Sequence, residues 1–200
     1  MKWLSILLFL AGLALGGPAR AQGPERAVVE SLHDALLTCM KNADALGFQG
    51  RFEHIAANLD QTFDLPFMAR LALGTAWKDL TPVQRADFVA LSRRFSAASY
   101  AHNFDGYGGE RFETLGAESA ARGTVVVQTE LVQPKEKPVR FDYRLRKSRD
   151  GWRIIDVHLD GMISELTIRR SEYRSLIQRK GFPGLVETLE EKIRDYSSGS

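Results

Sequence analysis

The sequence predicts an α+β fold, with a curved four-stranded antiparallel sheet that carries helices on one face and encloses an apolar pocket. Apolar residues recur at helical spacing before residue 104 and again after residue 165. Between these regions they alternate with polar residues, as they do in half-buried strands. The links between the alternating segments are short, which favours an antiparallel meander. No linker or internal repeat divides residues 22–200, so we expect a single domain.

The first 21 residues have the three parts of a secretory signal peptide. Lys2 gives the charged start, the segment 4–15 is apolar, and Ala19-Arg20-Ala21 has the small-x-small pattern of a cleavage site. The apolar run is shorter than the roughly 20 residues of a membrane-spanning helix. Gln22 follows the cleavage site, where a lipoprotein would need a cysteine. We therefore expect a mature chain that starts at Gln22 and diffuses in the periplasm.

Charge and cysteine content exclude several classes of protein. Removal of the signal takes away two of the 27 basic residues, and the remainder balance the 25 acidic ones. A neutral chain lacks the clustered positive charge of a nucleic-acid-binding protein. The basic residues between Arg169 and Lys180 are interpreted as a solvated helix face. Cys39 is the only cysteine, so the fold depends on its core and not on an intramolecular disulfide.

Helical patterns fill the first half of the mature chain. They cover 28–40, 52–59, 64–73 and 81–103. The clearest start is at Thr81, which can cap a helix that has Pro82 at its first position and Gln84 as the second member of a capping box.

Strand patterns follow at 111–116, 123–133, 139–146 and 152–159. The third alternates without a fault, which places Val139, Phe141, Tyr143 and Leu145 on one face and charges on the other. Two helices complete the chain, and the break between them is expected at Gly181 and Pro183.

Few residues offer catalytic chemistry. The four histidines lack metal-ligand spacing, and no nucleophile elbow or phosphate-binding glycine loop is present, so no metal or cofactor is expected. Asp156 and His158 share one face of the fourth strand and form the nearest candidate for an acid–base pair. They fit either a proton shuttle in an enzyme that acts on an apolar substrate or a pair of hydrogen-bonded structural groups.

Two blocks of the sequence carry the motifs of a known protein family. The first is Leu73-Gly74-Thr75-Ala76-Trp77 with Leu80 to Phe88, which has a leucine-glycine, tryptophan and threonine-proline-x-glutamine pattern. The second is Gly151 to Val157 with Asp160-Gly161, which has a tryptophan-x-isoleucine-x-aspartate-valine pattern. Both blocks are similar to segments of the MlaC family of periplasmic lipid carriers. Ser164 to Leu166 and Arg169 to Tyr173 depart from the pattern of the phospholipid-carrying members. That departure resembles the HpnM branch, which accompanies hopanoid biosynthesis genes.

The resemblance implies a periplasmic carrier that shuttles a hopanoid or a phospholipid between the inner and outer membranes. The HpnM branch would imply an inner-membrane transporter of the resistance-nodulation-division type, and the phospholipid branch an ABC transporter with a lipid-binding subunit. Membrane contact would be transient. At about 0.8 kcal/mol per methylene, a lipid moved through water without a carrier costs on the order of 10 kcal/mol or more.

The alternation and the aromatic content suggest which residues line the lipid pocket. The candidates are Trp77, Phe95, Phe104, Val127, Thr129, Phe141, Tyr143, Ile155 and Val157. Apolar periodicity is equally typical of a filled aromatic core. Two alternatives therefore stay open beside the carrier: the enzyme that uses Asp156 and His158, and a structural periplasmic adaptor.

Overall fold

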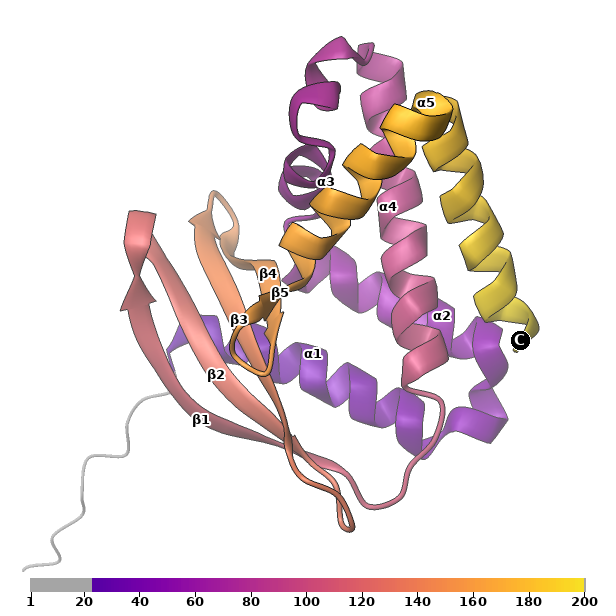
Figure 1. Cartoon of the computed structure of the whole chain (residues 1–200). Coiled ribbons are helices and arrows are strands. Elements are labelled where there is room, and N and C mark those ends of the chain that lie inside the picture. Colours follow the sequence, from indigo (N-terminus) through magenta and orange to yellow (C-terminus); the bar gives the residue numbers. More distant parts are fainter. Residues whose placement is uncertain (1–22, 200) are drawn as a thin grey trace, which may run out of the picture.

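The computed structural model describes residues 23–199, so the predicted signal peptide lies outside the described residues. The fold is α+β, and an antiparallel sheet carries the helices on one face (Figure 1). The strands follow one another in the order β1-β2-β3-β4-β5. Within the described residues, no helix combines the length and the apolar character needed to cross a membrane.

The bounds of the elements agree broadly with the sequence patterns. The helices are α1 (Pro24–Lys41), α2 (Ala43–Thr62), α3 (Leu65–Leu73), η1 (Gly74–Asp79, a 3₁₀ helix), α4 (Pro82–Asn103) and α5 (Glu165–Ser198). The strands are β1 (Arg111–Ala120), β2 (Thr124–Val132), β3 (Val139–Ser148), β4 (Gly151–Leu159) and β5 (Ile163–Ser164), and a short turn, η2 (Ala121–Gly123), joins β1 to β2. The predicted four-stranded sheet thus has a fifth, two-residue strand.

Local signals account for the ends of the helices. The capping box of α4 is confirmed: Gln84 N–H donates to Thr81 Oγ1 over 3.2 Å, and Thr81 N–H donates to Gln84 Oε1 over 2.9 Å. α2 is longer than its predicted 52–59 and is interrupted at Gly47, where φ is 57°. The predicted break between the last two helices is confirmed as an interruption inside α5. Gly181 has φ 71° there, and Pro183 follows it. The two halves of α5 therefore fold back on one another (Figure 1).

Two bulges alter the strand pattern. β1 continues four residues beyond its predicted end because pairing shifts between Thr114 and Gly116 and then resumes. In β4 the register shifts so that Leu145 pairs with Ile154, while Arg144 pairs with Asp156. Ile155 is the extra residue of this bulge. Simple alternation is therefore wrong for this position, and Ile154 takes the inward place that was predicted for Ile155.

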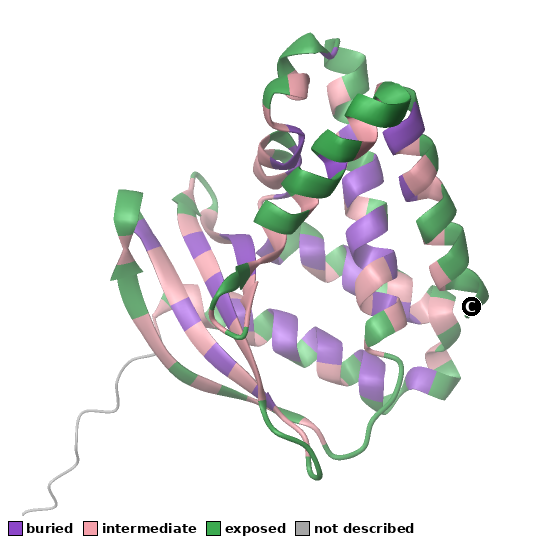
Figure 2. Cartoon of the chain, viewed as in Figure 1, coloured by how far each residue is buried: buried purple, intermediate pink, exposed green. Residues whose placement is uncertain are grey.

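The buried residues form two clusters (Figure 2). The first lies between the sheet and helices α1 and α2, and includes Leu36, Leu59 and Leu145. The second lies among α3, α4 and α5, and includes Phe88 and Leu185. α4 contributes to both, so it joins the sheet part of the molecule to the helical part.

A histidine occupies the first cluster. His33 of α1 is 4% exposed, stacks on Phe112 with 3.8 Å between ring centroids, and has its Nε2 3.2 Å from the Tyr143 hydroxyl. Burial lowers the pKa of His33 to about 3, because the imidazolium ion would lose its hydration there. The neutral ring is therefore the form that the folded protein holds.

This burial predicts a loss of stability in mild acid. The unfolded chain takes up a proton on His33 near pH 6.5, whereas the folded chain resists protonation down to about pH 3. The contribution of His33 is thus fully present above pH 6.5 and falls as the pH drops towards 3. Between pH 7 and pH 5 we expect a loss of about 2 kcal/mol in the free energy of unfolding. Urea titrations at both pH values measure it, and a His33→Leu variant with the same pH dependence as the unmodified protein would contradict the assignment.

Candidate functional site

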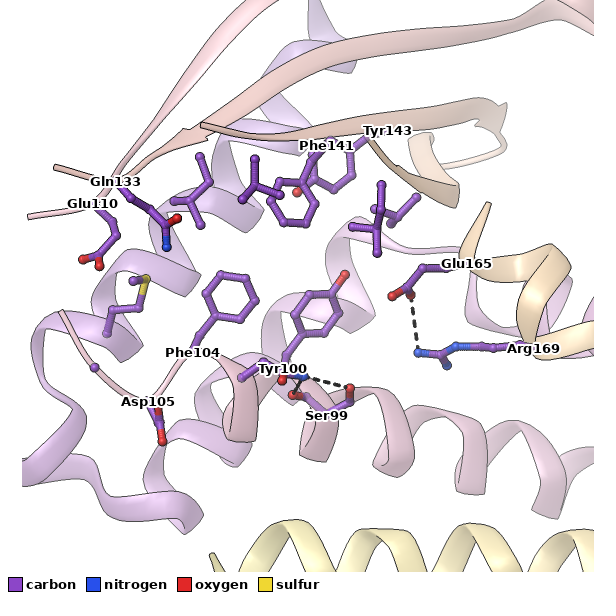
Figure 3. A pocket seen from close by; sticks show the side chains of 17 residues that line it. Ser99, Tyr100, Phe104, Asp105, Glu110, Gln133, Phe141, Tyr143, Glu165 and Arg169 are labelled. Atoms are coloured by element: carbon purple, nitrogen blue, oxygen red, sulfur yellow. Dashed lines mark hydrogen bonds and ion pairs between the residues drawn. The ribbon is translucent and has the colours of Figure 1, made fainter. Parts of the chain in front are cut away.

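A cavity of about 660 Å³ lies between the sheet, the C-terminal end of α4 and the first turns of α5 (Figure 3). Its volume is in the range typical of sites that bind small molecules and cofactors. Strands β2, β3 and β4 form one wall, and α4 with the loop that follows it forms the opposite wall. The cavity therefore lies beside the junction of the two buried clusters.

The middle of the cavity is apolar. Its wall is made by Met40, Tyr100, Phe104, Leu131, Val139, Phe141, Tyr143, Val157 and Leu159. Burial raises the pKa of the two tyrosine hydroxyls, so both stay protonated and uncharged near neutral pH. This section has the surface chemistry that suits a hydrocarbon chain or a fused-ring skeleton.

One end of the cavity lies at the loop between α4 and β1 and carries polar side chains. Asp105, Glu110 and Gln133 line it (Figure 3). The Glu110 carboxylate accepts a hydrogen bond from the Gly108 N–H. The ionisable groups that line this end are both acidic.

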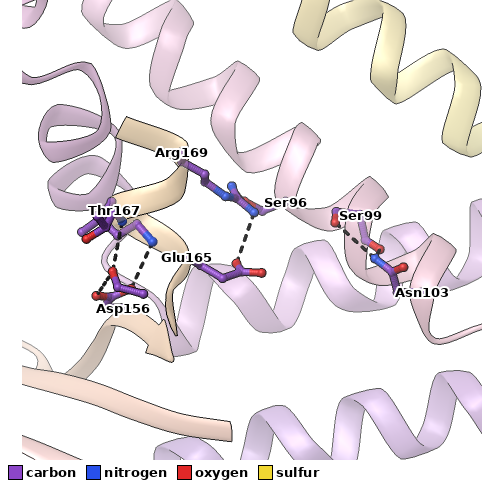
Figure 4. Close-up of polar contacts among 9 residues, drawn as sticks. Ser96, Ser99, Asn103, Asp156, Glu165, Thr167 and Arg169 are labelled. Atoms are coloured by element: carbon purple, nitrogen blue, oxygen red, sulfur yellow. Dashed lines mark hydrogen bonds and ion pairs between the residues drawn. The ribbon is translucent and has the colours of Figure 1, made fainter. Parts of the chain in front are cut away.

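The other end, which we call the α5 end, consists of Tyr100, Glu165 and Arg169. Arg169 Nη1 donates to Ser96 Oγ over 3.1 Å, and Arg169 Nη2 lies 3.6 Å from Glu165 Oε2 (Figure 4). The guanidinium group also lies over the Phe95 ring, 5.2 Å from its centroid. The prediction that Arg169 belongs to a solvated helix face is therefore wrong, since its side chain is only 20% exposed.

Asp156 fixes the start of α5 and so positions Glu165 and Arg169. Its Oδ1 accepts from the Leu166 N–H over 3.2 Å, and its Oδ2 accepts from the Ser164 hydroxyl over 2.7 Å. Ser164 Oγ in turn caps the helix by accepting from the Thr167 N–H. His158 Nε2 lies 3.6 Å from Asp156 Oδ2. Neither member of this pair lines the cavity.

Removal of the Asp156 carboxylate should weaken the fold. In Asp156→Ala the Leu166 N–H and the Ser164 hydroxyl lose their acceptor, and we expect the free energy of unfolding to fall by about 1–3 kcal/mol. Asp156→Asn retains an acceptor and should lose less. Thermal denaturation of both variants tests this. An Asp156→Ala protein as stable as the unmodified chain would show that the contact does not hold α5.

The nine predicted wall residues have different positions. Phe104, Phe141, Tyr143 and Val157 line the cavity. Val127 and Thr129 pair with Tyr143 and Phe141 across the sheet, but both are fully buried, and Thr129 donates a hydrogen bond to the Phe141 carbonyl. Alternation identified their side of the sheet but not which part of it the helices cover.

Three of the nine predicted wall residues lie outside the cavity wall. Trp77 lies in η1 next to Arg85, whose Nε donates to its carbonyl oxygen. Phe95 packs on Tyr196 in the second cluster, and Ile155 is the bulge residue of β4. The rings of Trp77 and Phe95 belong to the helical core and not to the cavity wall.

The sequence reasoning missed the α5 end. Glu165 and Arg169 stand four residues apart, so they share a helix face. Both fall in the segment that departs from the MlaC pattern. That departure was the one sequence signal that could have pointed to these two residues. It does not place them, because the crossing of α5 over β4 is what brings both side chains to the cavity.

Two comparisons with known proteins bear on this arrangement. Residues 30–191 match the family model described as MlaC protein. The fold is similar to that of a phospholipid-binding protein from Ralstonia solanacearum solved in complex with a phospholipid, with a TM-score of 0.74 and 22% sequence identity. The match covers 88% of this chain and 98% of that protein.

Proposed function

Because the chain belongs to the MlaC family, we propose that it carries a lipid through the periplasm between the inner and outer membranes. Proteins of this family are periplasmic, and they are lipid-binding carriers and not enzymes. The observation that carries the proposal is the apolar middle of the cavity, formed by residues such as Phe104, Phe141 and Val157. The position of Asp156 and His158 outside that cavity speaks against the catalytic alternative.

The size of the cavity limits what it can enclose. At about 30 Å³ for a group of the size of a water molecule, about 660 Å³ holds on the order of 20 methylene-sized groups. One acyl chain or most of a fused-ring skeleton fits inside, and the rest of a larger lipid can extend through the open side of the cavity. Transfer from a bilayer into such an apolar wall is close to neutral in free energy, which permits both loading and release.

Two cargoes are supported by separate observations. The segments Ser164 to Leu166 and Arg169 to Tyr173 resemble the HpnM branch and favour a hopanoid. The similar Ralstonia protein binds a phospholipid and favours that class. With a hopanoid we propose a transporter of the resistance-nodulation-division type as the inner-membrane partner, and with a phospholipid an ABC transporter whose lipid-binding subunit hands over the cargo.

Lipid extraction from the native protein tests the proposal. We expect protein released from the periplasm by osmotic shock to start at Gln22 and to hold about one lipid per chain. Intact-mass measurement determines the start of the chain, and mass spectrometry of the extract identifies the lipid. Lipid-free protein would contradict the carrier function. Recovery of Met1 in the membrane fraction would contradict the proposed signal peptide and periplasmic release.

A further inference from the structure

The Tyr100 hydroxyl at the α5 end has hydrogen-bonding capacity that the protein leaves unused. Figure 3 shows the Tyr100 side chain projecting from α4 towards the sheet, with its hydroxyl on the side of Glu165. Its ring is held between Phe63 and Phe104, with centroids 6.3 and 5.9 Å away. In the part of the chain that the structure describes, the hydroxyl makes no hydrogen bond.

Glu165 also has acceptor capacity to spare. Its Oε2 lies 3.6 Å from Arg169 Nη2, an ion pair longer than a hydrogen bond. Arg169 itself is engaged by Ser96 and by the Phe95 ring. An available acceptor and an available hydroxyl therefore lie at the same end of the cavity, next to its apolar middle.

The charges that line the cavity are unfavourable for a phosphate group. The ionisable acids and bases of the wall are Asp105, Glu110, Glu165 and Arg169. Arg169 is the only base among them, and Glu165 already balances its charge. A phosphate inside the cavity would meet a neutral ion pair at the α5 end and two carboxylates at the other end, and neither end offers the unpaired Arg or Lys side chain that commonly binds phosphate.

We propose that the α5 end is a subsite for an uncharged hydroxyl group of the cargo lipid. This inference rests on the proposed carrier function and narrows its substrate class. The cargo hydroxyl donates to the Glu165 carboxylate and accepts from the Tyr100 hydroxyl, while Arg169 holds Glu165 in place. Because burial raises the pKa of Tyr100, this tyrosine remains a donor throughout the physiological range. A purely apolar end group would displace water from Tyr100 and Glu165 and would form no hydrogen bond with either residue.

Three probes with one 18-carbon chain separate the possibilities. They are octadecan-1-ol, octadecane and octadecyl phosphate, each supplied in phosphatidylcholine vesicles to protein freed of its native lipid. Tyr100→Phe keeps the ring and removes only the hydroxyl. Uptake of each probe is compared between the unmodified protein and Tyr100→Phe. Differences in how the probes partition into the vesicles then do not affect the comparison. Tyr107→Phe is the matched control, because Tyr107 is 47% exposed and lies outside the cavity wall.

Tyr100→Phe should lower uptake of the alcohol about tenfold, the effect of one lost hydrogen bond. Uptake of the alkane should not change, and Tyr107→Phe should match the unmodified protein throughout. Melting temperatures confirm that all variants are folded. Unchanged uptake of the alcohol by Tyr100→Phe would overturn the subsite, as would an equal loss with the alkane or the phosphate. If the unmodified protein takes up neither a probe nor phosphatidylcholine from the vesicles, the carrier function itself fails.

Discussion

Phe141→Glu is expected to abolish lipid retention without unfolding the sheet. Phe141 is half-buried in β3 and its ring faces the cavity. In the unloaded protein, solvent in the cavity can hydrate the new carboxylate. An incoming hydrocarbon would displace that solvent, and a charge in apolar surroundings costs several kcal/mol. Retained lipid should therefore fall at least about a hundredfold.

Leu115→Glu is the matched control for this change. Leu115 is 49% exposed at the bulge of β1, so a carboxylate there stays in water and away from the cavity. Both variants are compared by lipid extraction together with circular dichroism and melting temperature. A folded Phe141→Glu protein that keeps its lipid would show that this face of the sheet does not bind the cargo.

Leu145→Ala should produce a large loss of stability. Leu145 is fully buried on the inward face of β3 and belongs to the cluster that joins the sheet to α1 and α2. Truncation removes apolar contacts and leaves a space that the flanking helices can only partly fill, which costs about 2–5 kcal/mol. Chemical denaturation measures the change, and Leu115→Ala, at an exposed position, should cost less than about 0.5 kcal/mol. Equal losses for the two variants would contradict the assigned core.

Local signals in the sequence were sufficient for much of the fold. The capping box at Thr81 and Gln84 and the break at Gly181 depend on neighbouring residues, so the sequence states them directly. The unbroken alternation of β3 likewise identified the inward face that carries Phe141 and Tyr143. The bulge at Ile155 has no such local signal, because it is defined by the pairing of β4 with β3.

Strand alternation predicted the cavity wall correctly only where an inward-facing residue is also left uncovered by the helices. Val127 and Tyr143 share one face and pair directly, yet only Tyr143 lines the cavity. Which part of a sheet face a helix covers is set by tertiary packing and not by alternation. Glu165 and Arg169 show the same limit, since their approach to Tyr100 depends on where α5 crosses the edge of β4. Long-range geometry of this kind is not specified by the local periodicity of a single sequence.

The bulge in β1 has a consequence for the behaviour of the protein at high concentration. β1 is the first strand in the order of the sheet, so one side of its backbone has no neighbouring strand within the described residues. A straight edge of this kind invites strand pairing between molecules and hence aggregation. The register shift between Thr114 and Gly116 interrupts the edge midway, and the charged Glu113 and Glu118 lie on either side of it. We therefore expect the irregular edge to disfavour self-association of the protein through its sheet.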